Sequence, residues 1–90
     1  MQSLRDSNRR PAHPGVILRK DVLPSLGITQ ATFANYLGVS AATVSRVLNQ
    51  KSVVSPELAA RISRIIGGSS ESWLRMQGAL NLWETQRVTG

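Results

Sequence analysis

The stretch from residue 28 to 49, ITQATFANYLGVSAATVSRVLN, constrains this chain more than any other part of it. It predicts two short helices joined by a tight corner. Thr29 can cap a first helix over residues 30–37, and Ser40 can cap a second helix that follows it directly. Gly38 comes one residue after the first helix, where a left-handed backbone closes a helix without a Cβ clash. The local requirements of a sharp helical corner are therefore met together.

The apolar residues of this stretch fall at helical spacing, on faces that would meet at the corner. Ala34 is small where the two helices must approach closely. An ordinary helical hairpin in an all-α core can also turn at a glycine. The small residue, the glycine and the valines at these offsets instead favour a helix-turn-helix, which places its second helix in the DNA major groove. The apolar set is Phe33, Leu37, Val39, Val44, Val47 and Leu48.

The charge of the chain favours a polyanionic partner. Eleven Lys and Arg residues against five Asp and Glu residues give a formal net charge of +6. No charged residue occurs from residue 22 to 45, so the cations flank the motif. A neutral surface between cations suits close approach to base edges, with the cations at the phosphates on either side. The flanking cations are Arg5, Arg9, Arg10, Arg19, Lys20, Arg46 and Lys51.

Several classes of function find no support in the sequence. The chain has no cysteine and a single histidine, so it offers no thiol metal site, no catalytic triad and no disulfide. Its acids are scattered, and no glycine-rich phosphate loop occurs. No apolar run approaches the length needed to span a bilayer, and no secretory signal is present. We therefore expect a cytoplasmic domain that is not an enzyme and holds no cofactor or metal.

A helix before the motif is predicted to open with HPG at residues 13–15. Pro14 suits the first turn, because its missing N–H would have no intrahelical partner there. The helix should run to about Leu23, where Pro24 stops it. We interpret His13, without a second histidine, as a structural residue at the start of this helix.

Two helices are predicted after the motif. SPE at residues 55–57 supplies an N-cap, a proline at the first position and an acid near the positive end of the helix dipole, and glycines at 67–68 end this helix. The last helix should run from residue 70 to about 85. The chain is thus predicted to be all-α, with one five-helix domain over residues 13–85. Residues 1–12 form an arm, interpreted as a solvated terminus rather than a DNA contact.

The last predicted helix carries large apolar side chains at spacings of three and four residues. One interpretation is that they simply cover the core. The other is a face that binds a second copy of the chain, since Trp and Met are enriched at protein interfaces. We expect a homodimer, because helix-turn-helix proteins usually read two half-sites. The residues predicted at this interface are Trp73, Met76, Leu80 and Trp83.

The chain resembles the HigA-type antitoxins, a branch of the phage-repressor-like helix-turn-helix family. The similarity covers about residues 13–82. The resemblance implies a lambda-repressor-like fold and a dimeric antitoxin that binds an inverted-repeat operator. It also implies that the protein neutralises a small ribonuclease toxin and represses their shared promoter. The broader family shows in residues 28–51, and the branch shows in HPG at 13–15, IL at 17–18, SPE at 55–57 and ESWL at 71–74.

The resemblance also implies which residues meet DNA. Base-reading positions of the second motif helix match Ala41, Ala42, Ser45 and Arg46, and positions near phosphates match Gln30, Ser40, Thr43, Asn49 and Lys51. Two features depart from the family. Alanines stand where many of these repressors carry amides, so hydrogen-bond readout is sparse. Gln50 stands where glycine is common.

The chemistry of these side chains suggests their roles. Arg46 is the candidate for a bidentate contact to guanine, and the two alanines can pack on thymine methyls. Asn49 is predicted to end its helix in the left-handed conformation, with its amide and Lys51 in reach of a phosphate. Two alternatives stay open. The chain can be a stand-alone repressor without a toxin, or a module whose last helix binds a protein and whose motif never meets DNA.

Overall fold

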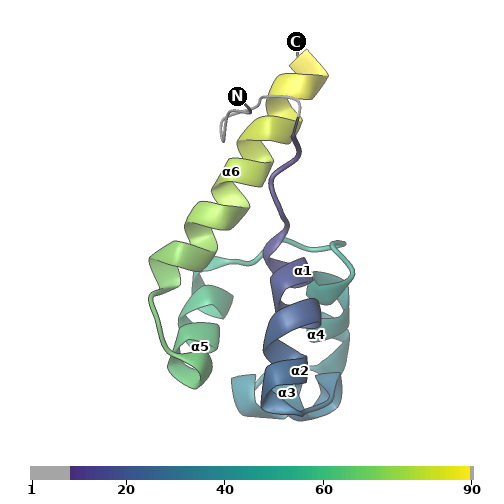
Figure 1. Ribbon diagram of the computed structural model, residues 1–90, viewed down its shortest axis with the longest axis vertical. Coiled ribbons are helices and arrows are strands. Elements are labelled where there is room, and N and C mark those ends of the chain that lie inside the picture. The colour runs from purple at the N-terminus through teal and green to yellow at the C-terminus, as the bar shows by residue number, and fades with distance from the viewer. Residues whose placement is uncertain (1–8, 90) are drawn as a thin grey trace.

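The computed structural model describes residues 9–89 (Figure 1). Five helical rods follow one another, and no strand occurs within the described residues, so the all-α prediction is confirmed. The predicted arm lies outside the described residues up to position 8. The first rod is continuous and consists of α1 (Pro14–Ile17), the π-helical turn η1 (Leu18–Val22) and α2 (Leu23–Leu26); the others are α3 (Gln30–Leu37), α4 (Ala41–Leu48), α5 (Pro56–Ile66) and α6 (Ser70–Thr89).

The helix caps predicted for the motif are confirmed. The Thr29 hydroxyl accepts the N–H of Thr32 at 3.1 Å and begins α3. The Ser40 hydroxyl accepts the N–H of Thr43 at 3.1 Å and begins α4. Between them Gly38 has a φ of 74°, the left-handed conformation that lets the chain turn sharply. Local side-chain chemistry therefore sets both ends of the corner.

The first rod corrects the prediction that Pro24 stops it. The rod continues through Pro24 to Leu26, because the turn before the proline is wider than an α turn. The N–H of Leu23 donates to the carbonyl of Leu18, five residues back. A proline has no N–H to donate four residues back, and its ring crowds the carbonyl there. The π turn accommodates that ring, and the rod ends instead at Gly27, where φ is 67°.

The first rod and α4 approach so closely that only glycine fits between them. A Cβ on Gly15 would collide with the backbone carbonyl of Val47. His13 fixes the start of the rod from the other side. Its Nδ1 accepts the Gly15 N–H at 2.9 Å, and its Nε2 bonds the carbonyl of Ser52 at 3.0 Å. The interpretation of His13 as a structural residue is confirmed, and its burial lowers the pKa of the imidazole.

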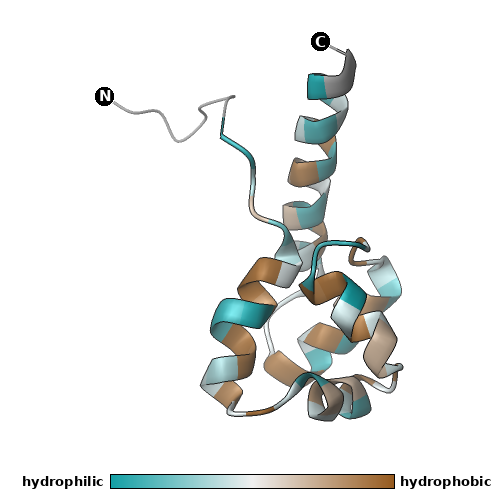
Figure 2. Ribbon diagram, turned by 90° about the vertical axis from the view of Figure 1, so that its right-hand side faces the viewer, coloured by the Kyte–Doolittle hydropathy of each residue, from teal (hydrophilic) through white to brown (hydrophobic). Residues whose placement is uncertain are grey.

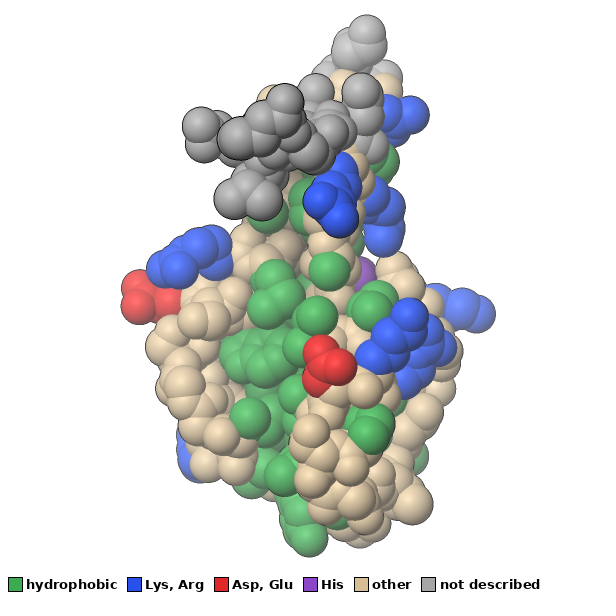
Figure 3. Space-filling model, in the orientation of Figure 1, with side chains coloured by type: hydrophobic (Ala, Val, Ile, Leu, Met, Phe, Trp, Pro, Cys, Tyr) green, Lys and Arg blue, Asp and Glu red, His purple; other side chains and the backbone are tan. Residues whose placement is uncertain are grey.

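The core lies among the motif helices, α5 and the first half of α6. Its most enclosed side chains are at most 1% exposed, and they come from every rod: Leu18, Phe33, Leu48, Ile62 and Leu80. The second half of α6 extends beyond the body of the other helices (Figure 2). On the face seen in Figure 3, hydrophobic side chains gather in the middle and the Lys and Arg side chains lie towards the edges.

Candidate nucleic-acid interface

The second motif helix, α4, turns one face to solvent. Ala42, Arg46 and Asn49 follow one another at helical spacing, and all three are exposed. Within the described range 9–89, the Arg46 guanidinium forms no hydrogen bond or ion pair, while the Arg46 carbonyl accepts the Lys51 N–H at 2.7 Å. The opposite face of the helix is enclosed in the core. Its buried residues are Val44, Val47 and Leu48.

The structure places all nine predicted DNA contacts at the surface, at the two motif helices and the loop after them. Seven are exposed: Gln30, Ser40, Ala41, Ala42, Arg46, Asn49 and Lys51. Thr43 and Ser45 are half-buried. The Ser40 and Thr43 hydroxyls bond each other at 2.9 Å.

The end of α4 corrects the prediction made for Asn49. Its φ of −96° is not left-handed. Instead its side-chain amide donates to the carbonyl of Ser45 at 2.9 Å and to the Ser45 hydroxyl at 3.3 Å, which satisfies the helix end. The left-handed residue is the next one, Gln50, with a φ of 62°. Gln50 therefore adopts the conformation that glycine would adopt at lower cost.

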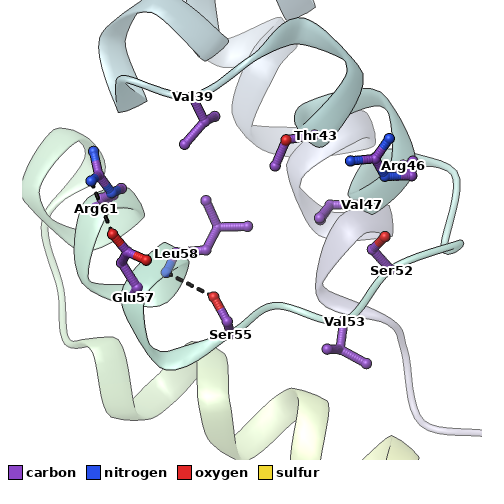
Figure 4. Close-up of a pocket in the computed structure, with 10 residues that line it drawn as sticks. All are labelled: Val39, Thr43, Arg46, Val47, Ser52, Val53, Ser55, Glu57, Leu58 and Arg61. Atoms are coloured by element: carbon purple, nitrogen blue, oxygen red, sulfur yellow. Dashed lines mark hydrogen bonds and ion pairs between the residues drawn. The ribbon is translucent and has the colours of Figure 1, made fainter.

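A groove of about 180 Å³ lies beside the exposed face, between α4 and α5 (Figure 4). Arg46 lines it from α4, while Glu57 and Arg61 line it from α5. The Arg61 guanidinium donates to the Leu37 carbonyl at 2.8 Å and to the Glu57 carboxylate at 3.0 Å. Arg61 thus caps the last turn of α3, directly before the corner glycine.

Sequence reasoning missed this role of Arg61. Arg61 is half-buried because its guanidinium reaches a carbonyl 24 residues earlier in the chain. No local pattern signals a contact of that range. The proximity of α3 and α5 had to be known first.

The residues predicted for a dimer interface separate into two pairs. Trp73 and Leu80 are 8% and 1% exposed, so they belong to the core of the single chain, as in the alternative interpretation. Met76 and Trp83 are half-buried and keep some accessible surface. Leu82, on the projecting half of α6, is 59% exposed and was not predicted.

Within residues 9–89, no group of three or more His, Cys, Asp or Glu residues is arranged to hold a metal ion. No helix in that range is both long enough and apolar enough to cross a membrane.

Comparison with known proteins matches residues 18–74 to the family described as helix-turn-helix. Antitoxin HigA-1 of Vibrio cholerae serotype O1 is 34% identical over 83 residues, which are 92% of this chain and 78% of the relative. The Pseudomonas aeruginosa antitoxin HigA, solved with the higBA promoter, superposes with a TM-score of 0.86 at 33% identity over 90% of this chain and 88% of that one. Antitoxin GraA, solved in complex with its operator, gives 0.81 at 35% identity over 88% and 80%. The chain therefore belongs to the phage-repressor-like helix-turn-helix family, in its branch of HigA-type antitoxins.

Proposed function

We propose that the chain is a dimeric antitoxin that binds an inverted-repeat operator, represses its own promoter and neutralises a small ribonuclease toxin. The observation that carries the DNA part is the exposed face of α4. Its small side chains let the helix approach base edges closely, and its one cation, Arg46, is unpaired within residues 9–89. The promoter and operator complexes of HigA and GraA support the same use of this fold.

The face of α4 suggests how a base sequence is read. Arg46 is exposed on that face, between Ala42 and Asn49, and can donate two hydrogen bonds to guanine O6 and N7. Ala41 and Ala42 offer methyl groups to thymine methyls, and Ser45 can bond either base type. Gln30 and Ser40 at the helix starts, with Thr43, Asn49 and Lys51, contact phosphates and fix the orientation on the duplex.

A second copy of the chain reads the second half-site of the operator. Its recognition helix enters the next major groove, about 34 Å along the duplex. We propose that α6 forms the interface, through the accessible surface of Met76 in its first half and through Trp83 and the exposed Leu82 in its projecting half. Met76 packs partly against the core, and Trp and Met are of the types enriched at interfaces.

The DNA assignment is tested by fluorescence anisotropy with duplex DNA from the chain's own promoter against random duplex. Arg46→Ala should cost ~1–3 kcal/mol and relax the preference at one base pair. Lys51→Ala should weaken all sequences alike and reduce the salt slope by about one unit. Arg75→Ala, an exposed arginine of α6, is the matched control. If Arg46→Ala kept the wild-type base preference, the reading role would be refuted.

The toxin assignment needs a separate experiment. Co-expression with neighbouring reading frames and pull-down through a tag should recover a stable, small, basic partner. If none is recovered while specific DNA binding persists, the chain is a stand-alone regulator. If no specific DNA complex forms, it is a protein-interaction module.

A further inference from the structure

Hydrogen bonds at alternate residues connect the loop from Gln50 to Val54 to other parts of the chain. The Gln50 side chain accepts from Arg10 at 3.2 Å, and the Ser52 carbonyl bonds His13 at 3.0 Å. The Val54 N–H donates to the side chain of Gln77, in α6, at 3.0 Å. The residues between them, at 51 and 53, are exposed. The loop thus presents Lys51 outwards while its inner groups are held.

Beneath residues 50–53 of the loop lies a cleft of about 120 Å³. Arg10, His13 and Gln77 line this cleft together with the loop itself. The Val54 side chain packs in the core at 2% exposure, whereas residues 50–53 border the cleft, which offers no van der Waals support on that side. The position of residues 50–53 therefore depends on the anchored Val54 backbone and on polar contacts. Loss of one contact should therefore displace the loop more than it would a packed segment.

Gln77, like His13, is a buried member of this set. Its side chain is 5% exposed, and both ends of its amide have partners. Its oxygen accepts the Val54 N–H, and its nitrogen donates to the Asn81 side chain at 3.0 Å. An apolar side chain of the same length would fill the same space but would leave a buried N–H without an acceptor.

We infer that Gln77 is a positioning residue for DNA binding, which holds the loop so that Lys51 stays aimed at a phosphate. The inference rests on the proposed DNA-binding function. Lys51 is then fixed from two sides. Its own N–H donates to the Arg46 carbonyl in α4 at 2.7 Å, and the chain three residues later is held by α6 through Gln77. The helix proposed for dimerisation is thereby joined to the phosphate-contacting loop.

The test is operator affinity against salt concentration for Gln77→Met, Lys51→Ala and the double variant. Gln77→Met should weaken binding by roughly three- to tenfold and reduce the salt slope by about one unit, as loss of one phosphate contact would. Since both changes act on the same contact, the double variant should bind no more weakly than expected from one of them. Asn81→Ala is the control, because it removes the other partner of Gln77 and leaves the loop contact in place.

A purely structural role would lower the folded fraction and leave the salt slope of the folded protein unchanged. Full additivity of the two variants, or a wild-type slope in Gln77→Met, would overturn the inference. Should Gln77→Met not fold, Gln77→Asn and Gln77→Glu replace it. Gln77→Asn, whose side chain is too short to reach Val54, should reduce the salt slope by about one unit. Gln77→Glu keeps an acceptor for the Val54 N–H and should retain the wild-type salt slope. Equal salt slopes in the two variants would overturn the inference. If the wild type binds its promoter no better than random duplex, the proposed function fails first and this inference with it.

Discussion

The contact between the first rod and α4 predicts that two glycine-to-alanine changes have opposite effects. In Gly15→Ala the new methyl group meets the carbonyl of Val47. That carbonyl accepts the N–H of Gln50 at 3.0 Å, so it cannot move without disturbing the loop. In Gly78→Ala the new methyl group meets nothing within 4 Å. Both sites are helical, so helix propensity favours alanine at both.

The magnitudes follow from these surroundings. Overpacking a core typically costs ~1–3 kcal/mol and more where the obstacle is backbone, so Gly15→Ala should cost about 3 kcal/mol or more. A domain of this size has a total stability of about 5–15 kcal/mol, so the loss is a large fraction, and the melting temperature should fall by roughly 12–24 °C. Gly78→Ala should gain ~0.5–1 kcal/mol and raise it by about 2–8 °C.

The assay is urea and thermal unfolding followed by circular dichroism at 222 nm. Two protein concentrations separate the stability of the fold from any self-association through α6. An unchanged denaturant slope would show that both variants unfold from the same compact state. A Gly15→Ala protein within about 1 kcal/mol of wild type would refute the close approach of the two helices.

Three further predictions concern the loop, the start of the first rod and the corner. Gln50→Gly should raise the free energy of unfolding by ~0.5–1 kcal/mol, and with it the urea midpoint, because glycine adopts the left-handed backbone without strain. A lowered urea midpoint would contradict this. As pH falls below about 6.5, wild type should lose stability relative to His13→Gln, because burial lowers the pKa of His13 and the unfolded chain takes up the proton first; parallel pH profiles from urea titrations would argue against it. Arg61→Met should cost ~1–2 kcal/mol in the same unfolding assay by uncapping α3, whereas Glu57→Gln should change stability by less than about 0.5 kcal/mol; equal losses would show that the exposed ion pair matters more than the cap.

Features set by neighbouring residues could be predicted from the sequence. Thr29, Ser40 and Ser55 begin their helices because a side-chain oxygen reaches an N–H three residues on. Gly38 closes α3 because only the local backbone decides its conformation. The exposed face of α4 also follows from helical spacing, which is why the predicted contacts all lie at the surface.

Features set by distant residues could not be predicted. A proline normally ends a helix, but the wider turn before Pro24 lets the helix continue. Leu18 and Leu23, on either side of that turn, are both buried in the core. The collision that requires Gly15 involves Val47, a residue more than 30 positions later in the chain. Trp73 proved to be a core residue because α6 packs on the other helices, which its spacing could not distinguish from packing on a second copy.

The π turn at Leu18–Val22 has a consequence for how chains of this shape can differ in length. Its hydrogen bond closes over five residues, where an α turn closes over four, so the rod holds one residue more than a regular helix between the same end points. Shortening the chain by one residue there would convert the bulge into an ordinary α turn, in which the Pro24 ring would crowd the carbonyl four residues back. A chain of this shape that lacks the extra residue is therefore expected to lack the proline as well, because the wide turn and the proline depend on each other.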